Sequence, residues 1–141
     1  MMSNNYLPNF GQYTPSETIR LVVTGKPITK KNSMRMVTNK KTGKVFPIPS
    51  KAYEMYRNIF LAQARYRGKP VAYRCNVQAV YYMPTRHRVD LTNLLSATHD
   101  LLVDAKVLED DNSKIVASVD GSTVLYDKDN PRVEITITRK E

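Results

Sequence analysis

The feature that most constrains the fold is a long alternating run in the middle of the chain, Tyr73–Met83. Its odd-numbered side chains are mostly apolar, and polar residues such as Arg74 and Gln78 stand between them. Successive side chains of a strand point to opposite faces of a sheet, so this period of two predicts one long strand with a buried face. Pro84 then ends the strand. Such a strand needs neighbouring strands and a covering layer.

The remaining periodic segments supply both. Further strands are predicted at Ile19–Thr24, Ile115–Val119, Ser122–Tyr126 and Arg132–Thr138. Apolar residues at helical spacing predict two helices. The first begins at the N-cap Ser50 and stops at Gly68, and the second follows the N-cap Asp90 and reaches Ala105. This order of elements predicts an α+β domain, in which a mixed β-sheet has two main helices packed on one face.

A basic segment punctuated by glycine separates the first strand from the first helix. Within it, residues 34–37 and 44–48 flank the sequence TNKKTG and are predicted to pair as a hairpin. A protruding loop of this composition suits contact with phosphates, and a solvated surface loop is the alternative. Together with two cations after the long strand, the candidate DNA-binding residues are Lys26, Lys30, Lys31, Arg35, Arg86 and Arg88.

The balance of charge favours a polyanionic partner. The chain has 22 Lys and Arg against 13 Asp and Glu, a net charge of +9. Nucleic acid is the favoured partner, with a membrane surface or plain solubility as alternatives. The single cysteine, Cys75, excludes an intramolecular disulfide and is expected in the core. Without a signal peptide or a transmembrane run, the expected location is the cytoplasm. Residues 1–17 are predicted to form a flexible arm, and residues 18–141 a single domain.

Carboxylates are concentrated in one part of this basic chain. They are Asp90, Asp100, Asp104, Glu109, Asp110 and Asp111. The second helix is about 20 Å long, so Asp90 and Asp111 converge only if the segment beginning at Val107 runs back alongside it. Converging carboxylates would hold the divalent cation that phosphodiester hydrolysis uses. The alternative is that Asp90 is only an N-cap and that residues 110–113 are only a turn.

The sequence of residues 83–116, MPTRHRVDLTNLLSATHDLLVDAKVLEDDNSKIV, resembles the RusA family of Holliday-junction resolvases. The family has a strand ending near methionine-proline, then basic residues, an Asp-x-Asp-Asn-Leu motif, a lysine on the following helix and a later Asp-Asp pair. The resemblance implies a RusA-like fold and a structure-selective endodeoxyribonuclease. It also implies a homodimer that cuts branched DNA by paired nicking with Mg²⁺, for which Mn²⁺ can substitute, in a bacterial or phage-infected cell.

Residue by residue, the resemblance implies that Asp90 and Asp111 are catalytic, magnesium-linked carboxylates. It gives Asp100 as a further candidate metal ligand. Asp110 is a fourth candidate ligand or orients its neighbour.

Two positions depart from the family pattern. Thr92 stands where the family has its second aspartate, and Ser96 where it has the lysine. These departures support an alternative, a non-catalytic protein that binds branched DNA through a degenerate site. A third hypothesis, a basic RNA-binding protein of ribosomal character, has only the basic loop and the tyrosines in its favour. A two-fold dimer would present two identical sites to a four-way junction, and the strand Tyr73–Tyr82 is its candidate surface.

Overall fold

The computed structural model describes residues 18–30 and 34–141. The predicted N-terminal arm, residues 1–17, and the candidate DNA-binding residue Lys31 lie outside the described residues. Within the described chain, neither helix has the length and apolar character needed to cross a bilayer.

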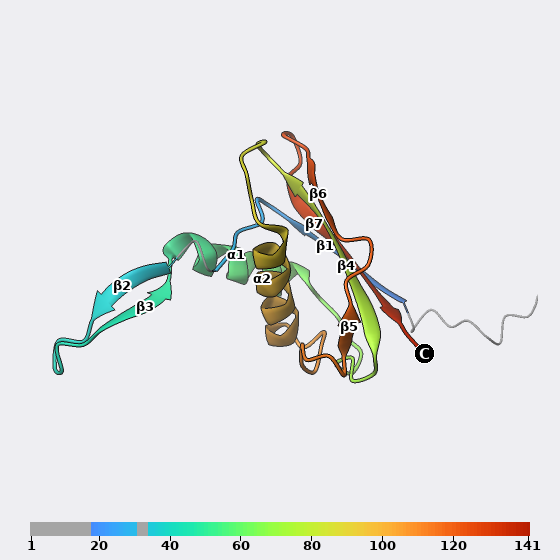
Figure 1. Ribbon diagram of the computed structural model, residues 1–141, viewed down its shortest axis with the longest axis horizontal. Helices are drawn as coiled ribbons and strands as arrows, with labels where there is room; N and C mark the ends of the chain where they lie inside the picture. Colours follow the sequence, from blue (N-terminus) through green and yellow to red (C-terminus); the bar gives the residue numbers. More distant parts are fainter. Residues whose placement is uncertain (1–17, 31–33) are drawn as a thin grey trace, which may run out of the picture.

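The alternating run forms β4 (Cys75–Met83), the central strand of a five-stranded sheet (Figure 1). On one side, β4 pairs antiparallel with β7 (Arg132–Arg139), which pairs antiparallel with the edge strand β1 (Thr18–Thr24). On its other side, β4 pairs in parallel with β5 (Val116–Ser118) and, further along, with β6 (Thr123–Tyr126). The sheet is therefore mixed, as predicted.

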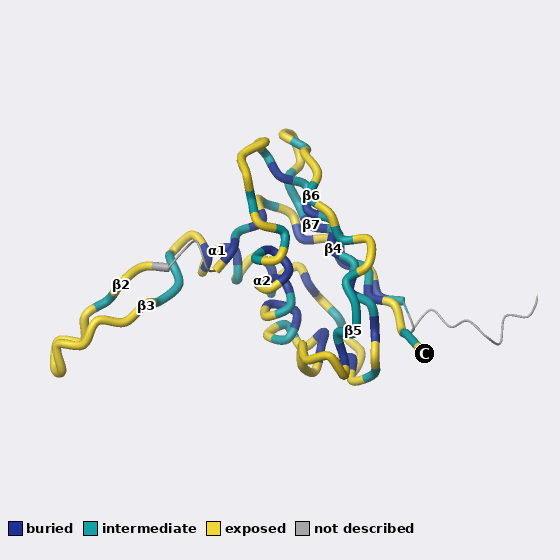
Figure 2. Tube along the Cα trace, viewed as in Figure 1, coloured by how far each residue is buried: buried dark blue, intermediate teal, exposed yellow. Residues whose placement is uncertain are grey.

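One face of the sheet is apolar because the strand register aligns the buried side chains of three strands. Val23 lies opposite Val133, which in turn lies opposite Tyr81, and all three are fully buried. The helices α1 (Lys51–Gln63) and α2 (Leu91–Asp104) cover this face (Figures 1 and 2). Their largest contributions to the core are Tyr53, Tyr56, Phe60, Leu94, Leu101 and Leu102. The predicted α+β architecture with two helices on a mixed sheet is confirmed.

Cys75 belongs to this core, as its place in the alternation predicts. It is fully buried, and its thiol donates a hydrogen bond to the carbonyl oxygen of Ile115 at 3.1 Å. Burial raises the pKa of the thiol to about 11, so the side chain stays protonated at neutral pH.

The first helix starts where the sequence predicts and stops earlier. The Ser50 hydroxyl accepts a hydrogen bond from the Tyr53 amide at 3.2 Å, so Ser50 is the N-cap. The predicted stop at Gly68 is wrong, because α1 ends at Gln63. The Gln63 carboxamide oxygen accepts a hydrogen bond from the Thr24 amide at 2.9 Å, which ties the end of the helix to β1. Gly68 has a different role, since the ring of Tyr66 occupies the space that a side chain there would need.

The chain reverses sharply after α2. Lys106 adopts a left-handed backbone conformation with a φ of 63°, and the Val107 amide donates to the carbonyl oxygen of Leu102 at 3.0 Å. The segment that follows forms an isolated parallel bridge between Leu108 and Val71. The strand that could begin at Val107 is therefore reduced to this single bridge.

A two-stranded hairpin, β2 (Met34–Thr38) and β3 (Val45–Pro49), projects away from the sheet (Figure 1). The two strands pair antiparallel, and in the described chain each has the other as its only strand partner. The predicted hairpin is confirmed.

Candidate active site

Asp90 is the N-cap of α2. Its Oδ1 atom accepts hydrogen bonds from the Thr92 amide at 2.9 Å and from the Thr92 hydroxyl at 2.6 Å. The N-cap prediction is confirmed. Thr92 therefore contributes a neutral hydroxyl that donates to Asp90, at the position where the resemblance leads us to expect a second carboxylate.

The segment after α2 brings Asp111 close enough to Asp100 for its charge to act on that carboxyl group. Partial burial and then the negative charge of Asp111 raise the pKa of the Asp100 carboxyl, and the Lys30 ammonium opposes this increase. Asp111 also acts on His99, whose pKa is lowered by burial and raised in part by the two carboxylates. The imidazole Nε2 is buried, and no group in the described part of the chain is its hydrogen-bond partner. Two carboxylates, a lysine and a histidine thus share one electrostatic environment.

Asp90 lies elsewhere along the same helix. Asp100 follows it by ten residues, which is about 15 Å along the axis at the rise of an α-helix. These two predicted ligands are therefore not brought together. Among the residues that the structure describes, no three Asp, Glu, His or Cys side chains are grouped closely enough to hold a metal ion.

A turn fixes the backbone at Asp111. The Asp110 carboxylate accepts a hydrogen bond from the Asp111 amide at 2.7 Å and another from the Asn112 carboxamide at 3.2 Å. The Asn112 carboxamide oxygen accepts from the Lys114 amide at 2.9 Å. Asp110 thus has the structural role that the turn alternative assigns to it, and this role orients its neighbour.

A cavity of about 450 Å³ lies where the base of the hairpin meets α1 and α2. Its lining includes Lys30 and Asp100 together with Tyr53, Arg57 and Asp104. The Arg57 guanidinium forms an ion pair with the Asp104 carboxylate at 3.2 Å. The sequence did not predict Tyr53 and Arg57 as neighbours of the acidic cluster, the carboxylates of Asp100, Asp104, Asp110 and Asp111. Their spacing of four residues, which places both on one side of a helix, is the only signal that the sequence offers.

The predicted DNA-binding cations near the hairpin have three different environments. Lys30 lines the cavity and acts on Asp100. Lys26 lies beside a separate apolar groove of about 270 Å³, next to Met55 of α1. Arg35 is exposed on β2. Of these three described cations, only Lys30 is therefore brought to the carboxylates.

The two predicted cations after β4 lie in the loop between β4 and α2. The Arg86 guanidinium stacks 4.1 Å from the centre of the Tyr126 ring, which holds it against β6. Arg88 is exposed in the loop that leads to Asp90. This loop carries positive charge to the start of α2.

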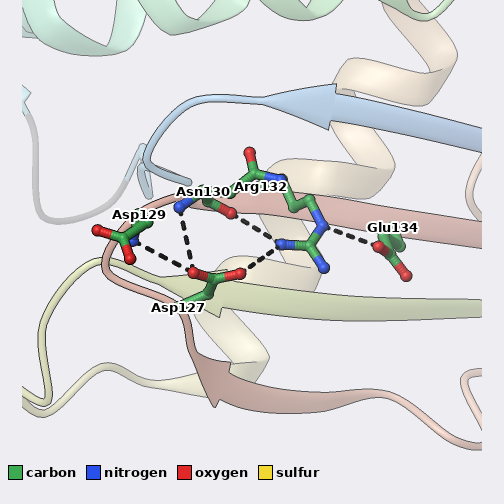
Figure 3. Close-up of polar contacts among 5 residues, drawn as sticks. All are labelled: Asp127, Asp129, Asn130, Arg132 and Glu134. Atoms are coloured by element: carbon green, nitrogen blue, oxygen red, sulfur yellow. Dashed lines mark hydrogen bonds and ion pairs between the residues drawn. The ribbon is translucent and has the colours of Figure 1, made fainter.

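The outer face of the sheet is polar and is organised around Arg132. Its guanidinium lies 3.8 Å from the centre of the Tyr82 ring. It donates hydrogen bonds to the carboxylates of Asp127 at 2.9 Å and Glu134 at 2.8 Å, and to the carbonyl oxygen of Asn130 at 2.8 Å (Figure 3). The hydrogen bond from Arg132 lowers the pKa of Asp127. Tyr82, the outward side chain near the end of β4, thus already has Arg132 as a partner within the chain.

Comparison with known proteins agrees with this architecture. Residues 24–138 match the family model described as Endodeoxyribonuclease RusA. The chain belongs to the RusA family. Over 96 residues it is 28% identical to the crossover junction endodeoxyribonuclease RusA of Aquifex aeolicus (strain VF5), a match that covers 68% of this chain and 74% of the relative. The RusA match runs from the end of β1 into β7, so it includes both helices and the acidic cluster. The resemblance predicted from residues 83–116 is confirmed.

The donor chemistry of this RusA-family site fits a divalent cation. Asp100 and Asp111 are oxygen ligands of the kind that Mg²⁺ prefers, and Mg²⁺ commonly uses one or two carboxylates with waters and substrate phosphate. Their mutual repulsion helps to raise the pKa of Asp100. A cation between the two carboxylates would offset that repulsion, because its charge favours their ionised forms.

Two substitutions at Asp90 separate its capping role from a catalytic one. Asn caps a helix about as well as Asp, so Asp90→Asn should change the free energy of unfolding by less than about 0.5 kcal/mol, whereas Asp90→Ala should cost about 1 kcal/mol. If the charge of Asp90 serves cleavage, both variants lose activity but only the Ala variant loses stability. Urea unfolding and DNA cleavage of the two proteins test this. If Asp90→Asn cuts DNA at the wild-type rate, Asp90 serves only as the helix N-cap.

Buried tyrosines should make the protein sensitive to alkali. Burial, followed by the charges of Asp100 and Asp104, raises the pKa of Tyr53 from 10.0 to about 12. The unfolded chain therefore ionises first, and the stability that Tyr53 contributes below about pH 10 is lost as the pH rises towards 12. The free energy of unfolding should fall over this range, and less steeply in Tyr53→Phe. Urea unfolding at several pH values measures both slopes, and identical slopes would contradict the assignment.

Proposed function

We propose that this chain is a structure-selective endodeoxyribonuclease that resolves Holliday junctions and other branched DNA by Mg²⁺-dependent paired nicking. The observation that carries the proposal is the carboxylate pair Asp100 and Asp111 beside Lys30, in a basic chain of the RusA family. Basic surface supplies the affinity for DNA that carboxylates alone would oppose. The Aquifex relative is named a crossover junction endodeoxyribonuclease, which supports the four-way junction as the substrate class.

The proposal gives the residues of the acidic cluster distinct roles. Asp111 and Asp100 hold the cation. The Asp110 carboxylate positions Asp111 by accepting a hydrogen bond from the Asp111 backbone amide. Asp90 is the second proposed catalytic carboxylate, at the start of α2. When bound, Mg²⁺ polarises the scissile phosphate and lowers the pKa of the attacking water. Lys30 draws a phosphate oxygen towards the carboxylates and limits their repulsion of the DNA backbone.

The proposal includes a homodimer. Two identical sites related by a two-fold axis match the two equivalent strands of a four-way junction. The predicted dimer surface, the strand Tyr73–Tyr82, presents outward side chains that already have partners within the chain. Tyr82 lies against Arg132, and the Gln78 carboxamide donates to the carbonyl oxygen of Gly121 at 3.3 Å. An interface on this face would therefore rest on the polar network of Arg132 rather than on an apolar patch.

One observation favours a second candidate, a branched-DNA-binding protein without nuclease activity. The hydroxyl of Thr92 donates to Asp90 at the position where a carboxylate is expected, so the site has one negative charge fewer. A neutral hydroxyl binds a divalent cation less strongly than a carboxylate does.

A cleavage assay distinguishes the two candidates. Wild-type protein is mixed with an end-labelled four-way junction in Mg²⁺, in Mn²⁺, and after removal of metal with EDTA. The nuclease proposal expects paired nicks with either metal and none in EDTA. Binding of the junction without metal-dependent nicking in any condition would support the non-catalytic candidate instead.

A further inference from the structure

The β2–β3 hairpin, residues 34–49, is an isolated two-stranded element. Apart from Val37, every residue from 35 to 47 is exposed, and Figure 2 shows this exposure along both strands. A two-stranded hairpin with no layer packed against it is at best marginally stable in water. We therefore expect a binding partner to cover the hairpin, and the amino-acid composition of the hairpin indicates the chemistry of that partner.

The charge of the hairpin is complementary to a polyanion. It carries four cations and, from residue 34 to residue 49, no Asp or Glu. The cations are Arg35, Lys40, Lys41 and Lys44. The turn between the strands is fixed, because the Asn39 carboxamide oxygen accepts hydrogen bonds from the Lys41 amide at 2.9 Å and the Thr42 amide at 3.3 Å. Gly43 closes the turn with a φ of +73°, a conformation that favours glycine. The lysines thus extend from a preformed tip.

Behind this tip the strands expose apolar side chains. Met36 is 64% exposed, Val45 58% and Phe46 41%. Met36 pairs with Pro47, and Phe46 pairs with Val37, so the two pairs lie on opposite faces of the ribbon. Both faces of the hairpin are therefore apolar beneath a cationic end.

This combination suits a branch point better than the groove of an intact duplex. Base edges in a groove are recognised by hydrogen-bonding side chains, which these positions lack. Apolar side chains instead stack on the flat faces of bases that have lost a neighbour, as wedges of Phe, Met or Pro do. Arms that meet at a junction offer such base faces next to closely spaced phosphates.

We propose that the hairpin inserts Met36 and Phe46 at the branch point while its lysine tip holds the phosphates of the flanking arms. The inference rests on the proposed function for its substrate class. It assigns the preference for branched over linear DNA to an element outside the acidic cluster. Selection of the substrate and cleavage of the strand are thereby divided between two parts of the chain.

Binding without metal tests the inference independently of cleavage. A four-way junction and a duplex of the same sequence are titrated in EDTA at one salt concentration, and 2-aminopurine at the branch point reports unstacking. The double variant Met36→Ala/Phe46→Ala should bind the junction about tenfold more weakly, the scale of one stacked base, and the duplex less than about twofold more weakly. It should also lose the 2-aminopurine signal. Phe46→Tyr keeps a flat ring and should retain the preference.

Two controls separate stacking from other effects. Met55→Ala removes a methionine that is 65% exposed on α1, and it should leave both affinities unchanged. Lys40→Gln/Lys41→Gln should weaken junction and duplex alike and reduce the salt dependence of both.

Three outcomes would overturn the inference: equal losses on the two DNAs in the Met36→Ala/Phe46→Ala variant, no loss at all, or a wild type without preference for the junction. Failure of the wild type to cut in Mg²⁺ would overturn the nuclease proposal alone, because the binding comparison contains no metal.

Discussion

A protein carrying Asp111→Asn should bind a four-way junction at least as tightly as the wild type and cut it at least about 1000 times more slowly. The substitution removes one of the two carboxylates proposed to hold the cation, Asp111, whose charge acts on Asp100. A cation contributes several kcal/mol to a phosphoryl-transfer transition state, and it does so only where the ligands hold it. DNA affinity comes from the basic surface and loses nothing when a negative charge is removed.

The measurement is single-turnover cleavage of a labelled junction, beside binding in EDTA. Asp129→Asn is the matched control, since Asp129 is an exposed aspartate on the connection between β6 and β7 (Figure 3), and it should cut at the wild-type rate. Thermal unfolding gives a second readout. Mg²⁺ should raise the melting temperature of the wild type more than that of Asp111→Asn. Normal cleavage by Asp111→Asn would remove Asp111 from the site.

Leu101→Ala should have the largest effect on stability, a loss of about 2–5 kcal/mol in the free energy of unfolding. Leu101 is fully buried on α2, directly after Asp100. Its truncation leaves a cavity between the helix and the sheet, which the surrounding side chains fill only in part. The helix that presents both Asp90 and Asp100 would then be poorly anchored.

Urea unfolding measures this loss as a lower midpoint with an unchanged slope. Leu125→Ala is the control, because Leu125 is 45% exposed on β6 and should change stability by less than about 0.5 kcal/mol. A loss below about 1 kcal/mol for Leu101→Ala would contradict the packing of α2 on the sheet.

Local patterns predicted the elements of this fold well. The alternation of Tyr73–Met83 identified the central strand because one face of β4 is buried along its whole length. The caps Ser50 and Asp90 were predictable because a cap depends on residues within one helical turn. The hairpin also followed from local turn residues.

Features decided by distant residues were not predictable. The end of α1 depends on a hydrogen bond between Gln63 and Thr24, which are 39 residues apart. The order of the strands was not predictable either. The periodicity of a strand does not show that β7 lies between β1 and β4, or that β5 and β6 pair in parallel with β4.

The candidate site also has a part that the sequence predicted and a part that it did not. The acidic residues were visible in the sequence, and the pairing of Asp111 with Asp100 depends on the sharp reversal at Lys106. The approach of Lys30 and of Tyr53 to Asp100 follows from the packing of α1 and of the hairpin base beside α2. Spacing along one chain does not encode contacts of that kind.

The place of β7 in the sheet has a consequence for biosynthesis. Both neighbours of this strand, β1 and β4, leave the ribosome before it does, yet neither is joined to the other until it arrives. A nascent chain that ends before Arg132 has β1 separate from the part of the sheet that β4 forms with β5 and β6. Completion of the sheet must therefore wait until β7 has been translated, and the exposed strand edges of the earlier segments depend meanwhile on whatever protects such edges in the cell.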